Sequence, residues 1–382
     1  MKIIKQLFGR LFSDVSQVPE VLKVSYFPSL DGFRALSVII VVTWHFYFTV
    51  SSTFYYDVIN GPMGVDIFFV ISGFLITTLL LKEKANTASI SLKKFYTRRV
   101  LRIFPAAYTY LFTVLAISLF FGYYIDKVNI AACFLYLADF SQLGNAHSTW
   151  ATGHFWSLAV EEQFYLIFPF ILKTNFRVYI STLLFILVFL PLLFIIMDKF
   201  PLINIRPIYY VTHFLIKLQG IAVGSLTAIL LFKKVIDIEN LKVSGILANF
   251  INLFLLLSIF LIHYDPNFSI NSVLKNGLIS ILIAMLLIFN IFKPRQNLFY
   301  KFLNTRIMKY IGVLSYSIYI WHILITDSYY KPLPAIFYKM PYSYVGIFIL
   351  AFLSYNFVEK PFLRLKKKFS TAPVPKRQAV EN

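Results

Sequence analysis

Charge is scarce in this sequence. Only 14% of its 382 residues are Asp, Glu, Lys or Arg, whereas a soluble domain carries about 25%. Hydrophobic residues make up 59% of the chain, and the mean hydropathy is +0.73. So few charges cannot cover a water-facing surface, which excludes a soluble globule, a disordered chain and a fibrous repeat. The composition indicates a protein that crosses a membrane several times.

Cysteine and recognisable cofactor motifs are also missing. Cys133 is the only cysteine, which excludes an internal disulfide bond and a cysteine-based metal site. The six histidines are scattered without the H-E-x-x-H spacing of a zinc enzyme, and no P-loop, GxSxG or GxGxxG sequence occurs. We therefore expect no bound metal and no permanently bound cofactor.

Acidic residues are few relative to basic ones. The chain has 17 Asp and Glu against 36 Lys and Arg, a net charge of +19. Such an excess can mark nucleic-acid binding, or it can mark the cytoplasmic loops of a membrane protein. Its distribution decides between the two, because 29 of the 36 basic residues fall on one side of an alternating membrane topology. The positive-inside rule then puts both termini in the cytoplasm, and we expect no nucleic-acid partner.

Long apolar runs are abundant. A bilayer is crossed by about 17–25 mostly apolar residues. The segment 128–140 has only thirteen residues, and an even number of spans is needed when both termini lie on one side, so we expect a re-entrant or surface segment there. We predict an all-α polytopic membrane bundle with ten spans: 33–50, 62–81, 103–123, 155–172, 178–197, 207–231, 243–263, 270–292, 310–327 and 342–363.

The two ends of the chain differ from this core. Residues 1–25 mix apolar and basic side chains, which predicts a short amphipathic helix on the cytoplasmic surface rather than a cleavable signal peptide. Residues 26–364 read as one membrane domain. Residues 365–382 form a basic, proline-containing tail, which we expect to be disordered in the cytoplasm.

The first span carries two ionisable residues, and such groups at membrane depth are candidate functional residues because they are costly. Arg34 and His45 are eleven residues apart, which puts them about 20° apart on one helix face and roughly 16 Å apart along its axis. Arg34 then lies at the cytoplasmic mouth and His45 in the outer half of the bilayer. The alternative is a snorkelling arginine and a histidine that only bonds a neighbouring hydroxyl.

Three arginines end the basic loop before the third span. Arg98, Arg99 and Arg102 lie beside the first apolar turn, and on a helix Arg99 and Arg102 share a face. Guanidinium groups bind phosphate through two parallel hydrogen bonds, so a phosphate-rich ligand is one interpretation. Ordinary topology-setting charge is the other.

The most informative polar pattern opens the fourth span. His154, Ser157, Glu161 and Tyr165 recur at helical spacing, and Glu162 lies about 100° round the helix from Glu161. Such a stripe must face protein or a water-filled cavity, because lipid would leave it without hydrogen bonds. Either it lines a reaction site or it only holds neighbouring helices together.

Two other spans carry smaller signals. Asp66 opens the second span, where we expect a structural role such as pairing with His45 or with an arginine. Ser315, Tyr319 and His322 form a further polar stripe in the ninth span.

Together these motifs resemble the acyltransferase-3 family of integral membrane acyltransferases. The resemblance covers about residues 26–363, and it is specific because several motifs occur in order. They are LDGFRA at 30–35 with the R-x10-H pair of Arg34 and His45, GVDIFFVISGFLI at 64–76, RVLRIFP at 99–105, WSLAVEEQFY at 156–165, LSYSIYIWH at 314–322 and FVEKP at 357–361.

The resemblance implies an enzyme of the bacterial cytoplasmic membrane. It would move an acyl group, by family precedent acetyl, from cytoplasmic acyl-CoA to a hydroxyl of an extracytoplasmic cell-envelope glycan or lipid-linked sugar. His45 would act as general base or as a transient acyl carrier, and Glu161 would orient it. The remaining roles are catalytic support by Asp66, acyl-CoA binding by Arg34, Arg98, Arg99 and Arg102, and an acceptor or supporting polar network of Trp156, Ser157, Glu162, Tyr165, Ser315, Tyr319 and His322.

One position departs from the family pattern. Where the family often shows an Arg and an Asp two residues apart before a Gly, this chain has Lys217 and Gln219 before Gly224, which bears on the choice of acceptor. The resemblance is to the membrane domain only, and we expect none of the extracytoplasmic hydrolase-like domain that some members carry. O-antigen, capsule, exopolysaccharide and peptidoglycan precursors all stay open as acceptors, and so does the oligomeric state, a homodimer included.

Two other classes of protein compete with this interpretation. A secondary transporter also places charges near the bilayer midplane, although we find no repeated halves and no matching pair of interrupted spans. A non-catalytic scaffold for envelope synthesis is the third hypothesis. Acyl transfer to a glycan distinguishes the enzyme from both.

Overall fold

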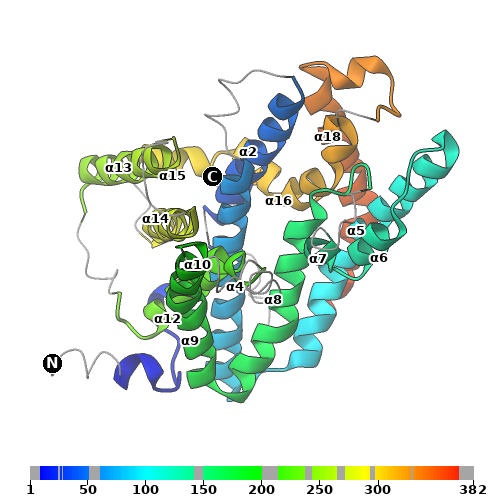
Figure 1. Ribbon diagram of the computed structural model, residues 1–382. Coiled ribbons are helices and arrows are strands. Elements are labelled where there is room, and N and C mark those ends of the chain that lie inside the picture. The colour runs from blue at the N-terminus through cyan, green and yellow to red at the C-terminus, as the bar shows by residue number, and fades with distance from the viewer. Residues whose placement is uncertain are drawn as a thin grey trace.

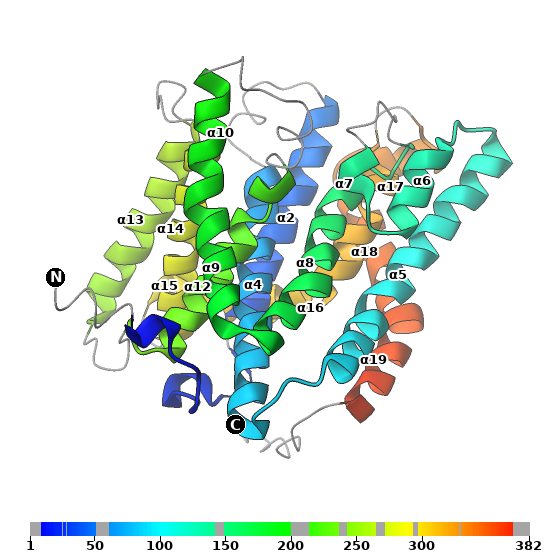
Figure 2. The ribbon, with the colours of Figure 1, turned by 60° about the horizontal axis from the view of Figure 1, so that its bottom comes forward.

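The computed structural model describes residues 9–24, 26–27, 29–50, 61–141, 149–199, 214–236, 243–264, 272–292, 297–327 and 330–369. Within these ranges the secondary structure is helical throughout, with no β-strand, which confirms the predicted all-α class. Figure 2 shows the long helices side by side, with the N-terminal segment and α19 at one end of the bundle and α6 and α7 at the other.

Seven helical segments in the described ranges are long and apolar enough to cross a membrane. Each overlaps a predicted span, because a continuous run of apolar residues is the property that both the prediction and the fold depend on. They are Gly61–Thr87 (α4), Leu92–Phe121 (α5), Phe155–Thr174 (α8), Phe176–Met197 (within α9 to α10), Gly245–His263 (within α13), Val273–Phe292 (within α14) and Tyr342–Phe369 (α18 to the end of the described chain).

The other three predicted spans also contain helices. The first corresponds to α2 (Leu30–Val50), the sixth to the apolar helix α12 (Gln219–Phe232), and the ninth to α16 (Arg306–Trp321) followed by α17 (Ile323–Thr326). The total of ten spans and the cytoplasmic location of both termini stay predictions.

The apolar segment at 128–140 folds as two short helices, α6 (Lys127–Phe134) and α7 (Ala138–Ser141). The Asp126 side chain caps α6 by accepting a hydrogen bond from the backbone N–H of Asn129 at 2.9 Å. Neither helix is long enough to cross a bilayer.

Helix α4 runs through the middle of the bundle and packs against α2, α8 and α12 (Figure 1). Two glycines allow α4 and α12 to approach closely. A Cβ on Gly73 would collide with the Ile221 carbonyl, and a Cβ on Gly224 would collide with the Val70 carbonyl. Small residues of this kind let helix backbones approach within a membrane, where no hydrophobic force drives helices together. The α4–α12 pair therefore forms a close-packed core beside the site described below.

Both ends of the described chain are docked on the bundle. Lys84 at the end of α4 forms an ion pair with Asp14 at 2.7 Å, and Lys233 donates a hydrogen bond to the Asp14 carbonyl at 2.9 Å. At the other end, Arg98 donates to the Phe369 carbonyl at 2.9 Å. Residues 365–369, at the start of the predicted tail, are helical and pack on α5. Residues 1–8 and 370–382 lie outside the described part.

Candidate active site

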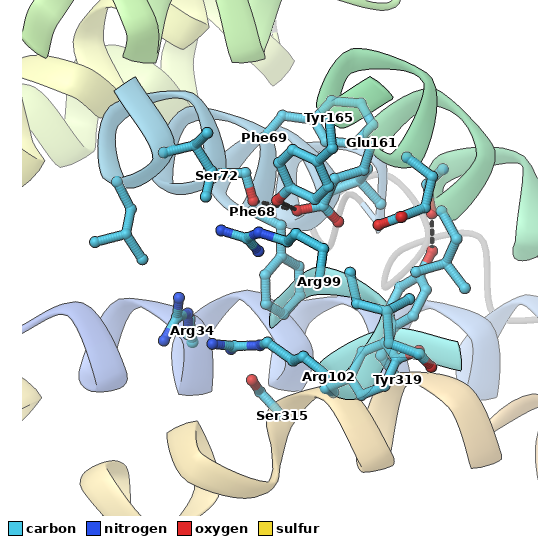
Figure 3. Close-up of a pocket in the computed structure, with 18 residues that line it drawn as sticks. Arg34, Phe68, Phe69, Ser72, Arg99, Arg102, Glu161, Tyr165, Ser315 and Tyr319 are labelled. Atoms are coloured by element: carbon cyan, nitrogen blue, oxygen red, sulfur yellow. Dashed lines mark hydrogen bonds between the residues drawn. The ribbon is translucent and has the colours of Figure 1, made fainter. Parts of the chain in front are cut away.

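A cavity lies between helices α2, α4, α5, α8 and α16, and it encloses about 770 Å³ when its open mouth is included (Figure 3). Nine of the fourteen predicted site residues line it, although they come from four separate helices. The polar lining is Arg34, Ser72, Arg99, Arg102, Ser157, Glu161, Glu162, Tyr165, Ser315, Tyr316 and Tyr319, and the apolar lining is Val65, Phe68, Phe69, Leu75, Ile76, Ile103 and Leu158.

Three guanidinium groups gather on one side of the cavity. Arg34 comes from α2, and Arg99 and Arg102 from α5; in Figure 3 the three side chains extend toward the same space. Arg34 is 3.5 Å from Asp31, and Arg99 lies over the ring of Tyr165 at 4.4 Å. Within the described ranges neither Arg99 nor Arg102 forms an ion pair, so of the three arginines only Arg34 is paired directly with a carboxylate.

A fourth predicted arginine has a different position. Arg98 forms an ion pair at 3.6 Å with Glu83, whose side chain is only 6% exposed. Arg98 also donates a hydrogen bond to the Phe369 carbonyl. It does not line the cavity. Lys366 of α19 (Lys360–Lys366) lies instead within electrostatic reach of the arginine cluster, although the sequence pattern assigned it to the tail.

The acidic wall is built by α8 and α4. Glu161 accepts hydrogen bonds from the Ser72 hydroxyl of α4 and from the Tyr165 hydroxyl one turn further along α8. Glu162 also lines the cavity. Three of the four stripe residues, Ser157, Glu161 and Tyr165, thus line the cavity, and Ser72 fixes the Glu161 carboxylate between two helices (Figure 3).

The inner wall is a hydroxyl pair, Ser157 and Tyr319, which hydrogen-bond to each other. Both hydroxyl oxygens also lie within hydrogen-bond distance of the backbone carbonyl of His154, at 3.1 Å for Ser157 and 3.2 Å for Tyr319, so one hydroxyl donates to the other and the second donates to the carbonyl. Behind this wall lies His322, whose ring centre is 5.5 Å from that of Tyr319. His45 follows, with its ring centre 4.8 Å from that of His322.

The arrangement differs in one respect from the expectation for Glu161. The carboxylate of Glu161 bonds Ser72 and Tyr165, whereas His45 contacts His322 and its own helix carbonyl at Val41. Spacing along a helix predicts which residues share a face, but it does not predict which face of another helix they meet. Glu161 therefore makes no direct contact with His45 through which it could orient the imidazole as predicted.

Two other predicted residues lie outside the cavity lining. Asp66 sits in α4, and among the described residues it forms no hydrogen bond or ion pair. The Trp156 ring packs against Phe69, with 6.3 Å between the ring centres. Lys217 Nζ lies 5.6 Å from the centre of the Trp156 ring. Since Lys217 occupies the position that departs from the family pattern, this departure lies directly beside α8. Gln219, the other departure, is buried at the start of α12.

Sequence reasoning missed Ser72, Tyr316 and Lys366. Ser72 was visible as a hydroxyl in an otherwise apolar span, but nothing in the sequence indicated that its partner would be Glu161. Tyr316 lines the cavity and donates to the Ile103 carbonyl at 2.6 Å. In the described part of the chain, no group of three or more His, Cys, Asp or Glu side chains is arranged to hold a metal ion.

The chain is similar in sequence to known O-acetyltransferases. The chain is 30% identical to the O-acetyltransferase OatA of Staphylococcus aureus (strain MRSA252) over 96% of this chain and 62% of that protein. It is 30% identical to the peptidoglycan O-acetyltransferase OatA of Listeria monocytogenes serovar 1/2a over 88% of this chain and 56% of that protein. A putative O-acetyltransferase of S. aureus (strain COL) is 31% identical over 89% of this chain and 58% of that protein.

The chain thus spans somewhat more than half the length of these relatives. No solved structure matches it. The family model described as an acyltransferase domain matches residues 27–355, which include the arginine cluster, the cavity and the histidines behind it. The chain therefore belongs to the acyltransferase-3 family of integral membrane acyltransferases.

Proposed function

We propose that this protein is a membrane O-acetyltransferase that takes an acetyl group from acetyl-CoA and transfers it to a glycan hydroxyl of the cell envelope. One observation carries the proposal. A single cavity has three guanidinium groups on one side and ends at a Ser157–Tyr319 wall with His45 and His322 behind it. The guanidinium groups can bind a phosphate-bearing donor, and a histidine at another depth of the same bundle can act as the base.

The arginine cluster suits the donor. Coenzyme A carries several phosphates, and Arg34, Arg99 and Arg102 share only the one ion pair to Asp31 within the described ranges. Guanidinium–phosphate contacts are charge-assisted and often bidentate, so arginines in a cavity that form no ion pair are well suited to bind such a ligand. The acyl end of the donor would extend between the apolar side chains of α4 toward Tyr319.

His45 is the proposed general base. Its imidazole takes the proton of the acceptor hydroxyl, and the oxygen attacks the thioester carbonyl carbon. The carbon–sulfur bond breaks, and the proton passes from the imidazolium to the leaving thiolate, so that an O-acetyl ester and free coenzyme A are formed. A transient acyl-histidine is the second route, in which the same imidazole attacks the thioester first.

The acceptor is proposed from the relatives. One of them is named a peptidoglycan O-acetyltransferase, and a hydroxyl of peptidoglycan or of its lipid-linked precursor is the corresponding acceptor here. The predicted topology puts the arginine cluster on the cytoplasmic side of a bacterial cytoplasmic membrane, where acyl-CoA is made, and His45 nearer the outer side.

The test is acetyl transfer by the purified protein. The wild-type protein in nanodiscs should transfer radiolabel from acetyl-CoA to peptidoglycan fragments. His45→Ala should reduce the rate by on the order of 10²-fold or more, the usual contribution of a general base. His263→Ala, a histidine of α13, is the control and should keep the wild-type rate.

Three outcomes would count against the proposal. Equal transfer by wild type and His45→Ala would end the role of His45. Ion-driven uptake without any acetyl transfer would favour a secondary transporter. Full envelope acetylation in cells that carry only the His45→Ala protein would favour a scaffold.

A further inference from the structure

The His45 and His322 rings meet across the bundle although 277 positions separate them in the chain. His45 Nδ1 lies 3.3 Å from His322 Nε2. His45 belongs to α2, and His322 lies between α16 and α17. His322 is fully buried, with 0% of its surface exposed, whereas His45 is partly buried.

Backbone carbonyls assign the tautomer of each ring. His322 Nδ1 lies 2.6 Å from the Tyr319 carbonyl, and His45 Nδ1 lies 2.9 Å from the Val41 carbonyl. A carbonyl oxygen only accepts hydrogen bonds, so each Nδ1 must carry the proton. In the neutral rings, His322 Nε2 and His45 Nε2 therefore both hold a lone pair.

The lone pair of His322 then faces the N–H of His45. The His45 Nδ1–H has two acceptors, the Val41 carbonyl and His322 Nε2. Among the described residues, no carboxylate lies within hydrogen-bond or ion-pair distance of His45. The other titratable groups that pack against the pair are His154, whose ring centre is 5.4 Å from that of His322, and Tyr319.

We infer that His322 is the positioning residue of His45: beside the Val41 carbonyl, its Nε2 is a second acceptor for the His45 Nδ1–H, and it orients the ring so that the free Nε2 can take the proton of the acceptor hydroxyl. This inference rests on the proposed function. In a Ser-His-Asp triad a carboxylate occupies this place, orienting the imidazole and stabilising the imidazolium. Here a neutral imidazole accepts from the same nitrogen. When His45 Nε2 gains a proton, its Nδ1–H keeps both acceptors, and the proton leaves again to the donor's thiolate.

The distinguishing experiment uses three substitutions at one position. His322→Leu removes the acceptor while filling much of the volume, His322→Gln brings an amide oxygen close to the position of Nε2, and His322→Asn is too short to do so. For purified variants in nanodiscs, kcat and the KM for acetyl-CoA are measured separately. We expect kcat of the Leu variant to fall by on the order of 10²-fold while KM stays within about twofold, since KM for the donor reports the arginine side of the cavity. The Gln variant should recover at least about tenfold of that loss, and the Asn variant should not.

Each outcome separates this inference from the proposed function. If the wild-type protein transfers no acetyl group, the proposed function fails. If the wild type is active and His45→Ala is not, but His322→Leu keeps the wild-type kcat, only the positioning role fails. If the Leu variant does not fold, equal kcat values for Gln and Asn overturn the inference. His263→Leu is the control for a histidine-to-leucine change away from the site and should leave kcat unchanged.

Discussion

At the scale of single residues, the positive charge of this protein divides into two groups. Lys93 and Lys94 at the start of α5 are exposed, as expected for topology-setting charge, whereas Arg99 and Arg102 on the same helix line the cavity. In the proposed function, the lysines set the orientation of the helix and the arginines further along it bind the phosphates of the donor. Composition alone could not separate these two uses, but position relative to the first apolar turn did indicate it.

Replacing Arg99 and Arg102 together with Ala tests the donor site. Charge-assisted hydrogen bonds contribute about 1.5–3 kcal/mol each. Losing two of them should raise the KM for acetyl-CoA by on the order of 10²-fold or more. The measurement is a steady-state titration of acetyl-CoA with the variant in nanodiscs.

Two controls make this result specific. Lys93→Ala with Lys94→Ala removes the same charge from the same helix outside the cavity and should leave KM unchanged. S-Acetylpantetheine, a donor without the nucleotide phosphates, should be used equally well by wild type and by the arginine variant. An equal loss with both donors would show that the arginines act on folding or on chemistry and not on phosphates.

The contacts of individual residues were the least predictable part of the site. Helical spacing correctly indicated that Ser157, Glu161 and Tyr165 face a common polar environment, and all three line the cavity. It could not indicate that His45 would meet His322, because that contact depends on how α2 and the end of α16 cross. Only the relative position of the helices supplies this information.

At the scale of helices, the site depends on the packing of α4 against α12. Helix α4 supplies both Gly73, at the α12 contact, and the adjacent Ser72, which holds Glu161. A shift of α4 away from α12 would therefore move a hydrogen-bond donor of the cavity wall. Stability and activity should be coupled at this interface.

Gly224→Ala tests this coupling. Its added Cβ would collide with the Val70 carbonyl, a backbone atom that cannot rotate away. Overpacking of this kind costs about 1–3 kcal/mol. We expect a lower thermal unfolding midpoint in detergent and a reduced kcat. Gly9→Ala, where an added Cβ meets nothing within 4 Å, should leave both unchanged; an unaltered Gly224→Ala protein would disprove the close approach of the two helices.

The positions of the long helices were largely predictable from the sequence, but the irregular turns within them were not. Long apolar runs correctly indicated the seven candidate spans, because hydropathy and length are properties of the sequence itself. Local irregularities escaped prediction: π-helical turns interrupt the chain at Phe185–Phe189 and Ser354–Glu359, and a turn at Lys217 and Leu218 precedes α12. Phe185–Phe189 is as apolar as its surroundings, so hydropathy carries no signal of that break. Ser354–Glu359 and the turn at Lys217 contain polar residues, but hydropathy does not specify where the hydrogen-bond register of a helix changes.

At the scale of the whole molecule, the proposal assigns a direction to the reaction. The basic side of the cavity lies toward the predicted cytoplasmic face, and the histidines lie deeper in the bundle. In this proposal, the protein carries the acyl group part of the way across the membrane before it reaches the acceptor. Donor and acceptor would then be usable only from opposite sides.

Sided acetyl transfer in proteoliposomes tests this central claim most directly. Protein orientation is determined by labelling an exposed Ser89→Cys with a membrane-impermeant maleimide, since the native Cys133 is buried. Radiolabelled acetyl-CoA is supplied on the side of residue 89, and peptidoglycan fragments are enclosed on the other side. We expect labelled glycan to form in this arrangement and not when donor and acceptor are exchanged. Transfer only in the exchanged arrangement, or none in either, would contradict acetyl transfer through the bundle from the arginine cluster to His45.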